Sequence, residues 1–335
     1  MKKPSISIII PVYNVEPYIE ACLNSVIHQS YDGIIECIVV DDCGSDNSMN
    51  IADKVIANYN GSISFKIVHH DCNRGLSAAR NTGMDAAIGD YLFFLDSDDY
   101  ISDECIERLV EPLNNYQFDL VIGNYQHVDE NKNNLVSDYI IKISDKTMLL
   151  HEDILHAYSL HQITPMAWGR LIRSDFVRSN KLFFMEGILH EDELWSFQVF
   201  NLSKSLFFVN QKLYYYRIRK RSITNSKTNK SIDSLVTIVV EMGKLAKKRK
   251  NNYKENFKLI RDLFYQTLNA NISTSIFIRN YKIMHQYILP SKLYFLKLNW
   301  NNPQRFIRDF HLLLPSFIAP YCGYGMKKLL FTIRK

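Results

Sequence analysis

Short β-branched runs alternate with segments of helical periodicity over the first 120 residues, and this alternation limits the possible folds more than any other feature of the sequence. Such alternation is typical of a parallel sheet whose connecting helices cover its faces. We therefore expect an α/β fold with a Rossmann-like, mostly parallel sheet and flanking helices. The pattern predicts strands at residues 7–12, 37–40, 64–68 and 91–95, and helices at 15–28, 45–58 and 75–87.

The pattern becomes irregular after residue 100 and turns mostly helical beyond about residue 231. We therefore expect a helical C-terminal region, 231–335, after the α/β part of the chain. In the irregular part, the sequence predicts helices at 101–113, 148–158 and 194–202, strands at 119–122 and 205–217, and a hairpin or loop at 129–134.

Composition excludes several classes of protein. With 335 residues and 47% hydrophobic content, the chain can bury one large core or two modest ones, so overall disorder is excluded. Its six cysteines form no CxxC pair, which argues against a zinc site or a disulfide framework and favours free thiols in a reducing cytoplasm. No apolar run approaches the roughly 20 residues of a spanning helix. We expect a cytoplasmic protein, soluble or peripheral on the inner face of the membrane.

Charge is distributed unevenly along the chain. From residue 242 to the end, 18 lysines and arginines face three acids, a net charge of +15, which leaves −10 for residues 1–241 because the total is +5. Helical stretches ending in the basic segment 326–335 suit adsorption to an anionic membrane surface. An ordinary helical subdomain with a basic outer face explains the charge equally well. No motif supports nucleic-acid binding.

An acidic cluster, Asp96-Ser97-Asp98-Asp99, follows the fully apolar strand predicted at 91–95. Ligands bind at the carboxyl ends of strands in open parallel sheets. Mg²⁺ and Mn²⁺ prefer oxygen ligands, commonly one or two carboxylates together with substrate phosphates. The cluster therefore indicates a divalent-metal site, and a solvated loop with helix-capping aspartates is the alternative.

Other polar positions also admit a chemical role and a structural one. Asp42 ends the second predicted strand, where its carboxylate can accept a base N–H or cap the next helix. Arg80 offers a planar fork for a phosphate or base edge, or a surface salt bridge. Glu191 and Asp192 open an apolar helix, so they supply a general base or complement the helix dipole. Arg217 lies in a basic, aromatic run that closes over a diphosphate or forms an edge strand.

In combination, these motifs resemble family 2 glycosyltransferases of the type that builds bacterial surface polysaccharides. The resemblance covers roughly residues 5–225. It rests on the order and spacing of Ile8-Ile9-Ile10-Pro11-Val12-Tyr13-Asn14, Val40-Asp41-Asp42, 75–83, Leu95-Asp96-Ser97-Asp98-Asp99 and His190-Glu191-Asp192-Glu193. It implies the A-type glycosyltransferase fold, with a catalytic domain at 1–225 divided into a nucleotide-binding half, 1–120, and an acceptor half, 121–225.

The resemblance also implies a reaction, namely inverting, non-processive transfer of one hexosyl or N-acetylhexosaminyl unit. The donor would be a nucleotide-sugar, most often a UDP-sugar, and the acceptor a hydroxyl of a glycan or lipid-linked molecule. The implied cofactor is Mn²⁺ or Mg²⁺. No QxxRW segment of the processive type is present. One sugar per encounter is therefore expected.

By matching motifs, the resemblance assigns roles to single residues. Asp98 would ligate the metal, with Asp96 on the ribose or metal side. Asp192 would be the catalytic base, with Glu191 orienting it or contacting the acceptor. The residues expected to bind the nucleotide are Pro11, Val12 and Tyr13 around the nucleoside, Glu16 nearby, Asp42 at the uracil N3–H, and Arg80 and Arg217.

Two alternatives come from other functional classes. A non-catalytic subunit of a polysaccharide-assembly complex could keep the fold, although intact acids at both sites count against it. A sugar nucleotidyltransferase also uses a metal and a Rossmann-like sheet. It would be expected to carry a glycine-rich phosphate loop directly after the first strand, where this chain has Pro11-Val12-Tyr13-Asn14.

Overall fold

The computed structural model describes residues 3–129, 135–137, 141, 143–219, 228–248, 252–269, 273–288, 309–314 and 317–325. The chain divides into two compact units, residues 1–225 and 226–335. The basic ending predicted at 326–335 lies outside the described residues. Within the described ranges, no helix combines the length and the apolar content that crossing a bilayer requires.

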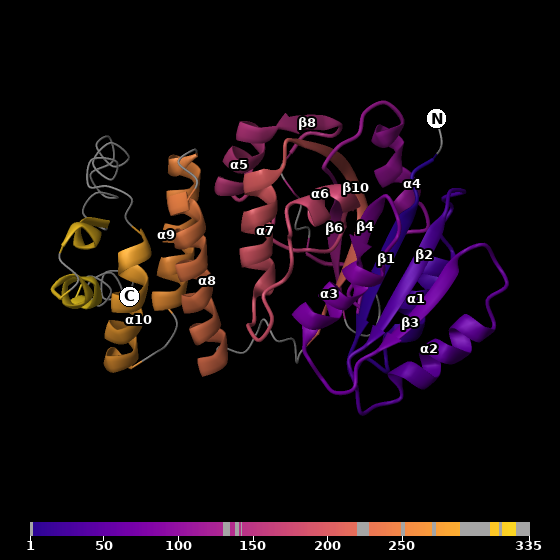
Figure 1. The fold of residues 1–335 in the computed structure, drawn as a ribbon, viewed down its shortest axis with the longest axis horizontal. Helices are drawn as coiled ribbons and strands as arrows, with labels where there is room; N and C mark the ends of the chain where they lie inside the picture. Colours follow the sequence, from indigo (N-terminus) through magenta and orange to yellow (C-terminus); the bar gives the residue numbers. More distant parts are fainter. Residues whose placement is uncertain are drawn as a thin grey trace. The chain divides into compact units, whose positions relative to one another are not determined.

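The first unit is built on one mixed sheet with flanking helices (Figure 1). Along the main path the strand order is β3-β2-β1-β4-β9-β6-β10-β5, with β7 paired to β6 and β8 paired to β10. The pairs β1–β2, β1–β4, β2–β3 and β6–β10 are parallel, and the others are antiparallel. The first half of the sheet, β3-β2-β1-β4, is parallel throughout, and antiparallel strands are inserted into the second half. This arrangement confirms the predicted Rossmann-like, mostly parallel sheet.

The first half of the sheet follows the predicted alternation. All seven residues of β1 are buried, as expected for a strand covered on both faces. Helix α3 packs against β1 and β2. The elements of this half are β1 (Ile6–Val12), α1 (Ile19–Ile27), β2 (Ile35–Asp41), α2 (Ser48–Ala57), β3 (Ser64–His69), α3 (Leu76–Ala86) and β4 (Tyr91–Phe94).

The second half corrects three local predictions. The predicted helix 101–113 begins with a strand residue, since Ile101 pairs with Tyr214 of β10. The strand predicted at 119–122 runs on to Asp129, and the start of the helix predicted at 148–158 is the edge strand β8. The elements are β5 (Tyr100–Ile101), α4 (Cys105–Val110), η1 (Glu111–Asn114), β6 (Leu120–Asp129), β7 (Leu135–Ser137), β8 (Thr147–Leu150), α5 (His151–Ser159), β9 (Arg170–Arg173), α6 (Ser174–Ser179), α7 (Glu191–Leu202) and β10 (Ser205–Ile218).

The antiparallel pairing of β6 with β7 makes the predicted hairpin, although residues 130–134 themselves lie outside the described part.

The second unit is helical, as predicted. Its three long helices are α8 (Asn229–Lys248), α9 (Tyr253–Asn269) and α10 (Thr274–Ile288), followed by the short η3 (Phe310–Leu313). The three long helices pack against one another. Buried Asp309 receives hydrogen bonds from Arg261 and Tyr265 of α9, which anchors the segment carrying η3 to the helices.

Candidate active site

Arg80 lies at the centre of an ionic cluster that joins three distant parts of the first unit. This α3 side chain is 1% exposed. Its Nη2 donates to Asp96 Oδ1 at 2.8 Å, and its Nη1 donates to Glu191 Oε1 at 2.9 Å and Asp192 Oδ1 at 2.7 Å. The face of Phe184 lies 5.2 Å from the guanidinium carbon. The predicted metal-side acid and the predicted catalytic acids therefore share one buried cation.

The backbone at the start of α7 sets the position of the two acids. His190 precedes the helix in the left-handed conformation, with φ of 62°. For a residue other than glycine this conformation costs about 1–2 kcal/mol, and such strained residues are common at active sites. The turn places Glu191 and Asp192 in the first helical turn, facing Arg80.

Burial changes the acidity of this cluster. Removal from water raises the pKa of Glu191 to about 7, and the neighbouring Asp192 charge adds to the effect. The pKa of Asp192 is also raised, mainly by burial, against the opposing field of Arg80. The Asp192 side chain still keeps 22% of its surface exposed. A partly accessible carboxylate with a raised pKa has the properties of a general base.

The carboxyl end of β4 carries the acidic cluster predicted as a metal site. Asp98 pairs with Arg219, and burial raises the pKa of the Asp98 carboxyl although Arg219 opposes this. Asp99 is 1% exposed and accepts hydrogen bonds from the Tyr214 hydroxyl and the Arg217 amide, both at 2.7 Å. Asp99 therefore has a structural role, which leaves Asp96 and Asp98 as the acids partly open to solvent.

Arg217 and Arg219 extend from the end of β10 toward this cluster. The Arg217 Nε donates to the Asp98 carbonyl at 2.9 Å, and its guanidinium lies over the rings of Tyr18 and Tyr100. Arg217 is 7% exposed. Arg217 therefore supports the backbone of the acidic loop from its buried side, whereas Arg219 forms the ion pair with the Asp98 carboxylate.

Two carboxylates within three residues suit a hard divalent cation that also binds substrate phosphates. Asp96 and Asp98 supply oxygen atoms at the carboxyl end of β4. Each is paired with an arginine that a diphosphate could attract. The donor set therefore fits Mg²⁺ or Mn²⁺ brought in with a nucleotide. Among the described residues, no three histidine, cysteine or acidic side chains gather into a metal site of their own.

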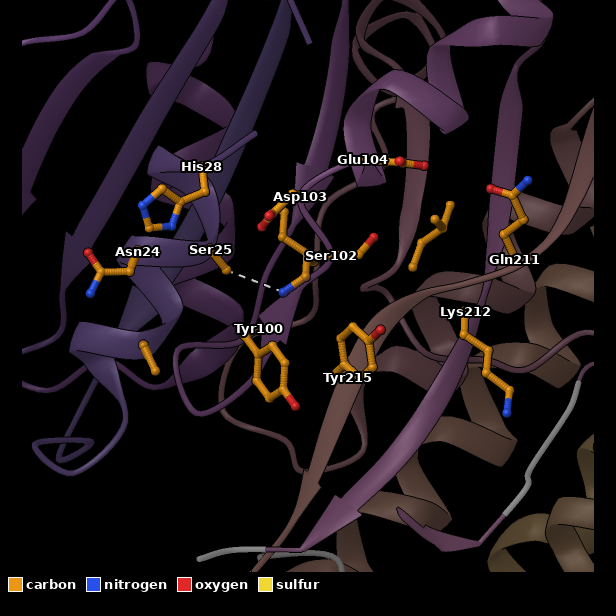
Figure 2. A pocket seen from close by; sticks show the side chains of 13 residues that line it. Asn24, Ser25, His28, Tyr100, Ser102, Asp103, Glu104, Gln211, Lys212 and Tyr215 are labelled. Carbon is orange, nitrogen blue, oxygen red and sulfur yellow. Dashed lines mark hydrogen bonds between the residues drawn. The ribbon is translucent and has the colours of Figure 1, made fainter. Parts of the chain in front are cut away.

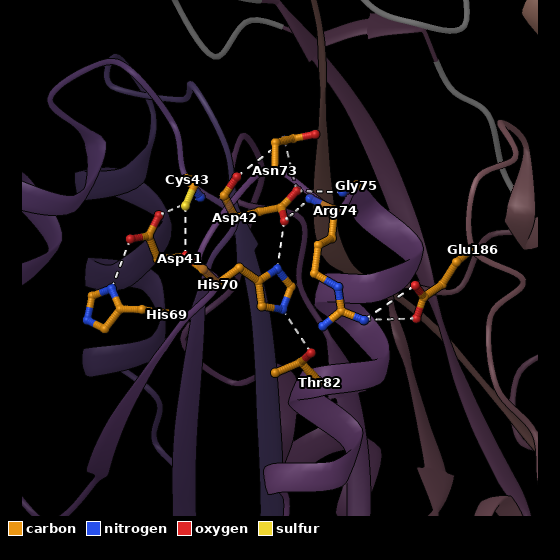
Figure 3. A network of polar contacts seen from close by, with 10 residues as sticks. All are labelled: Asp41, Asp42, Cys43, His69, His70, Asn73, Arg74, Gly75, Thr82 and Glu186. Carbon is orange, nitrogen blue, oxygen red and sulfur yellow. Dashed lines mark hydrogen bonds and ion pairs between the residues drawn. The ribbon is translucent and has the colours of Figure 1, made fainter.

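Asp42 organises the loop after β3 (Figure 3). Its carboxylate accepts hydrogen bonds from His70 Nδ1 at 2.7 Å, Asn73 Nδ2 at 3.0 Å, and the amides of Arg74 and Gly75, both at 2.8 Å. Gly75 has φ of 87°. Asp42 is only 2% exposed, so it shapes this edge of the sheet through the 70–75 loop.

This network yields a stability prediction. Asp42→Ala removes the acceptor of four donors, of which His70 is buried and the other three are partly exposed. An unpaired buried group costs about 1–3 kcal/mol, and each further lost hydrogen bond costs about 0.5–1.5 kcal/mol. We expect the free energy of unfolding to fall by roughly 3 kcal/mol or more, measured by urea denaturation. The matched control is Asp53→Ala on the exposed side of α2, which should stay within about 0.5 kcal/mol of the original chain. Equal losses in the two variants would contradict the assignment.

The loop after β1 is tied to the loop after β2. Glu16 accepts a hydrogen bond from the Asn47 amide at 3.1 Å, and the Glu16 amide donates to Asp46 at 2.8 Å. Of the residues predicted to line the nucleoside pocket, Pro11 and Val12 are buried in β1, whereas Tyr13 is 48% exposed. The side chains of Tyr13 and Glu16 are therefore open to solvent at this loop, and Pro11 and Val12 are buried in the strand that precedes it.

An open groove with a volume of about 760 Å³ lies behind the acidic loop (Figure 2). It is lined by residues of α1, β5 and β10, including the stacked rings of Tyr100 and Tyr215, whose centroids are 4.8 Å apart. None of the residues assigned above to the metal or the catalytic base lines it. The candidate site is instead the polar edge where Asp96, Glu191 and Asp192 meet at Arg80, with Asp98 two residues further along the chain from Asp96.

Comparison with known proteins supplies the family. The model of glycosyl transferase family 2 matches residues 7–185. The putative glycosyltransferase EpsH of Bacillus subtilis is 32% identical over 238 residues, which are 70% of this chain and 67% of EpsH. The chain belongs to glycosyltransferase family 2.

Other family members differ in length. Glycosyltransferase GlyA of Streptococcus pneumoniae is 34% identical over 70% of this chain, but the chain spans only 34% of GlyA. The crystal structure of Staphylococcus aureus TarS 1–349 in complex with UDP covers 96% of the chain with a TM-score of 0.69 and 19% identity, and 88% of that structure is covered. The TarS likeness confirms the A-type glycosyltransferase fold.

Sequence reasoning missed two arginines of this glycosyltransferase. Arg219 was visible only as one cation of a basic run, and its pairing with Asp98 depends on β10 lying beside β5. Arg170 gave no signal beyond its position at the start of a strand. Its complete burial next to the site is a tertiary property. Trp168, Trp195 and Tyr125 are all buried in aromatic clusters.

Proposed function

We propose that the protein is an inverting, metal-dependent glycosyltransferase that moves one sugar from a UDP-sugar to a hydroxyl of a glycan or lipid-linked acceptor in cell-surface polysaccharide synthesis. The observation that carries the proposal is the joining of Asp96, Glu191 and Asp192 through Arg80. It connects a donor-side acid at the end of β4 with a partly open carboxylate able to deprotonate an acceptor.

Each residue has a role in this proposal. Asp98 and Asp96 would hold Mn²⁺ or Mg²⁺, which neutralises the charge that develops on a departing diphosphate. Asp192 would accept the proton of the attacking hydroxyl, with Glu191 holding the shared cation. Tyr13, Glu16 and Asp42 would form the nucleoside end, with Asp42 acting on the uracil or through its loop. Arg80, Arg217 and Arg219 would supply positive charge near the phosphates.

The relatives support the choice of donor. A TarS 1–349 structure with UDP-GlcNAc has a TM-score of 0.61 to this chain, and TarS is named a poly(ribitol-phosphate) β-N-acetylglucosaminyltransferase. A thermal-shift screen against UDP-, GDP- and dTDP-sugars with Mn²⁺, followed by assay of UDP release from the stabilising donor, tests the proposal. We expect stabilisation by UDP-sugars and not by GDP- or dTDP-sugars. A chain that neither binds nor cleaves any nucleotide-sugar would refute the proposal.

The raised pKa values predict how activity depends on pH. Asp192 must be ionised to accept a proton, and its raised pKa means that ionisation is completed at a higher pH than the usual value of about 4. Arg80, Glu191 and Asp96 surround it, and Glu191 itself titrates near 7. Turnover should therefore fall as pH decreases from about 8 to 5 and recover on return to pH 8. A rate that stays flat down to pH 5 would contradict this prediction.

A further inference from the structure

The segment between α5 and β9 is held next to the site by hydrogen bonds to its backbone carbonyls. The carbonyls of Thr164 and Met166 both accept hydrogen bonds from Nη2 of Arg170. The carbonyl between them, on Pro165, accepts a hydrogen bond from the hydroxyl of Ser196. Three successive carbonyls are therefore fixed by two buried side chains.

The next amide in this segment reaches the predicted catalytic base. The Ala167 N–H donates to Asp192 Oδ2 at 3.2 Å, while Arg80 holds Asp192 Oδ1 at 2.7 Å. The two oxygens are thus bonded from different sides. A carboxylate fixed at both oxygens cannot rotate, so its remaining lone pairs keep one direction.

Arg170 is unusual for a residue of β9. It is 1% exposed, its guanidinium lies 5.3 Å from the ring of Phe200, and its Nε and Nη1 have no hydrogen-bond partner in the described part of the chain. Burial lowers its pKa to about 10, and the charge of Asp192 opposes this change. A cation buried without a paired carboxylate is costly. A role of the Arg170 side chain at the site would explain why a cation is buried there despite this cost.

We propose that Arg170 is a positioning residue for Asp192, acting through the Thr164 and Met166 carbonyls to hold the Ala167 amide against the carboxylate. This inference rests on the proposed function, in which Asp192 is the base. In the proposed function the donor would be bound by other elements, namely α3 and the ends of β1, β2, β4 and β10. Loss of Arg170 should therefore slow the chemical step without weakening the binding of UDP-sugar.

The first experiment compares kcat with the KM for the UDP-sugar. Arg170→Met should lower kcat at least tenfold and leave the donor KM within about twofold. Arg170→Lys, which keeps a cation able to donate to both carbonyls, should recover kcat to within about threefold. Equal effects on kcat and KM, or failure of lysine to restore activity, would overturn the proposal.

The matched control is Arg173→Met. Arg173 lies at the other end of the same strand, pairs with Asp119 and also has a buried Nε without a hydrogen-bond partner among the residues that the structure describes. Its replacement should reduce stability, measured by urea denaturation, and leave kcat unchanged in the folded enzyme. A fall in kcat as large as that of Arg170→Met would show that any defect in β9 has this effect, which would also overturn the proposal.

A readout independent of activity completes the test. Amide hydrogen exchange at Ala167 should accelerate in Arg170→Met and in Ser196→Ala, which loosens the same segment from the α7 side, and should stay slow in Arg173→Met. Unchanged exchange would refute the positioning role. If exchange accelerates but Asp192→Asn retains transfer, the loop is as described and the assignment of the base is at fault.

Discussion

Asp192→Asn is expected to lower sugar transfer by about 10²–10⁴-fold while UDP binding remains within about threefold of the unmodified enzyme. Asparagine keeps the size of the side chain, and its single carbonyl oxygen can still accept the hydrogen bond from Arg80, although its amide nitrogen cannot accept one from Ala167. It cannot accept the proton of the attacking hydroxyl. The measurement is transfer from the active UDP-sugar, with UDP affinity determined by calorimetry on the same preparation.

Asp153→Asn provides the control for this variant. Asp153 is an exposed acid in the first turn of α5, so the same chemical change occurs at a comparable helix position. Its activity should equal that of the unmodified enzyme. Full transfer by purified Asp192→Asn would remove this residue from the role of base.

Asp98→Ala should abolish metal-dependent transfer and metal-dependent hydrolysis of the donor. The change removes a predicted ligand for Mn²⁺ and leaves Arg219 without the carboxylate it meets. Donor turnover should fall to the rate seen with a chelator present, a loss of at least about 10³-fold, because the charge on the departing diphosphate is no longer neutralised. The assay is UDP release across a Mn²⁺ titration.

Asp103→Ala controls for the loss of negative charge near this loop. Asp103 is exposed and lies five residues further along the chain, beyond β5. Its Mn²⁺ dependence should match that of the unmodified enzyme. A normal response to Mn²⁺ in Asp98→Ala would assign the metal to other ligands or exclude it from the reaction.

The sequence predicted the part of the fold in which local pattern and burial agree. Strands β1, β2 and β4 are mostly apolar runs, and β2 and β4 lead into aspartates, so both the sheet edge and Asp96 could be placed. Asp192 required the family resemblance, because an acid that opens a helix has an ordinary electrostatic explanation. Its contact with Arg80 joins residues 112 apart in the sequence.

The errors have local physical causes. The predicted end of β6 was too early because Asn124 and Gln126 look like loop residues, yet both are buried and Asn124 bonds Asn210 and the Ile141 amide. Residues 148–150 were predicted as helix because the side chains of methionine and leucine favour it. Pairing with β10 along an edge overrides that propensity. In both cases the deciding partner comes from a distant segment.

The position of Arg80 has a consequence for the engineering of this enzyme. Because one guanidinium contacts the acid after β4 and the acids that open α7, which the proposed function assigns to the donor and the acceptor, substitutions at the two ends should be strongly non-additive. Libraries that vary α3 together with the start of α7 would mostly sample inactive combinations. Acceptor preference is better altered at positions that do not touch this cation, where changes can accumulate one at a time.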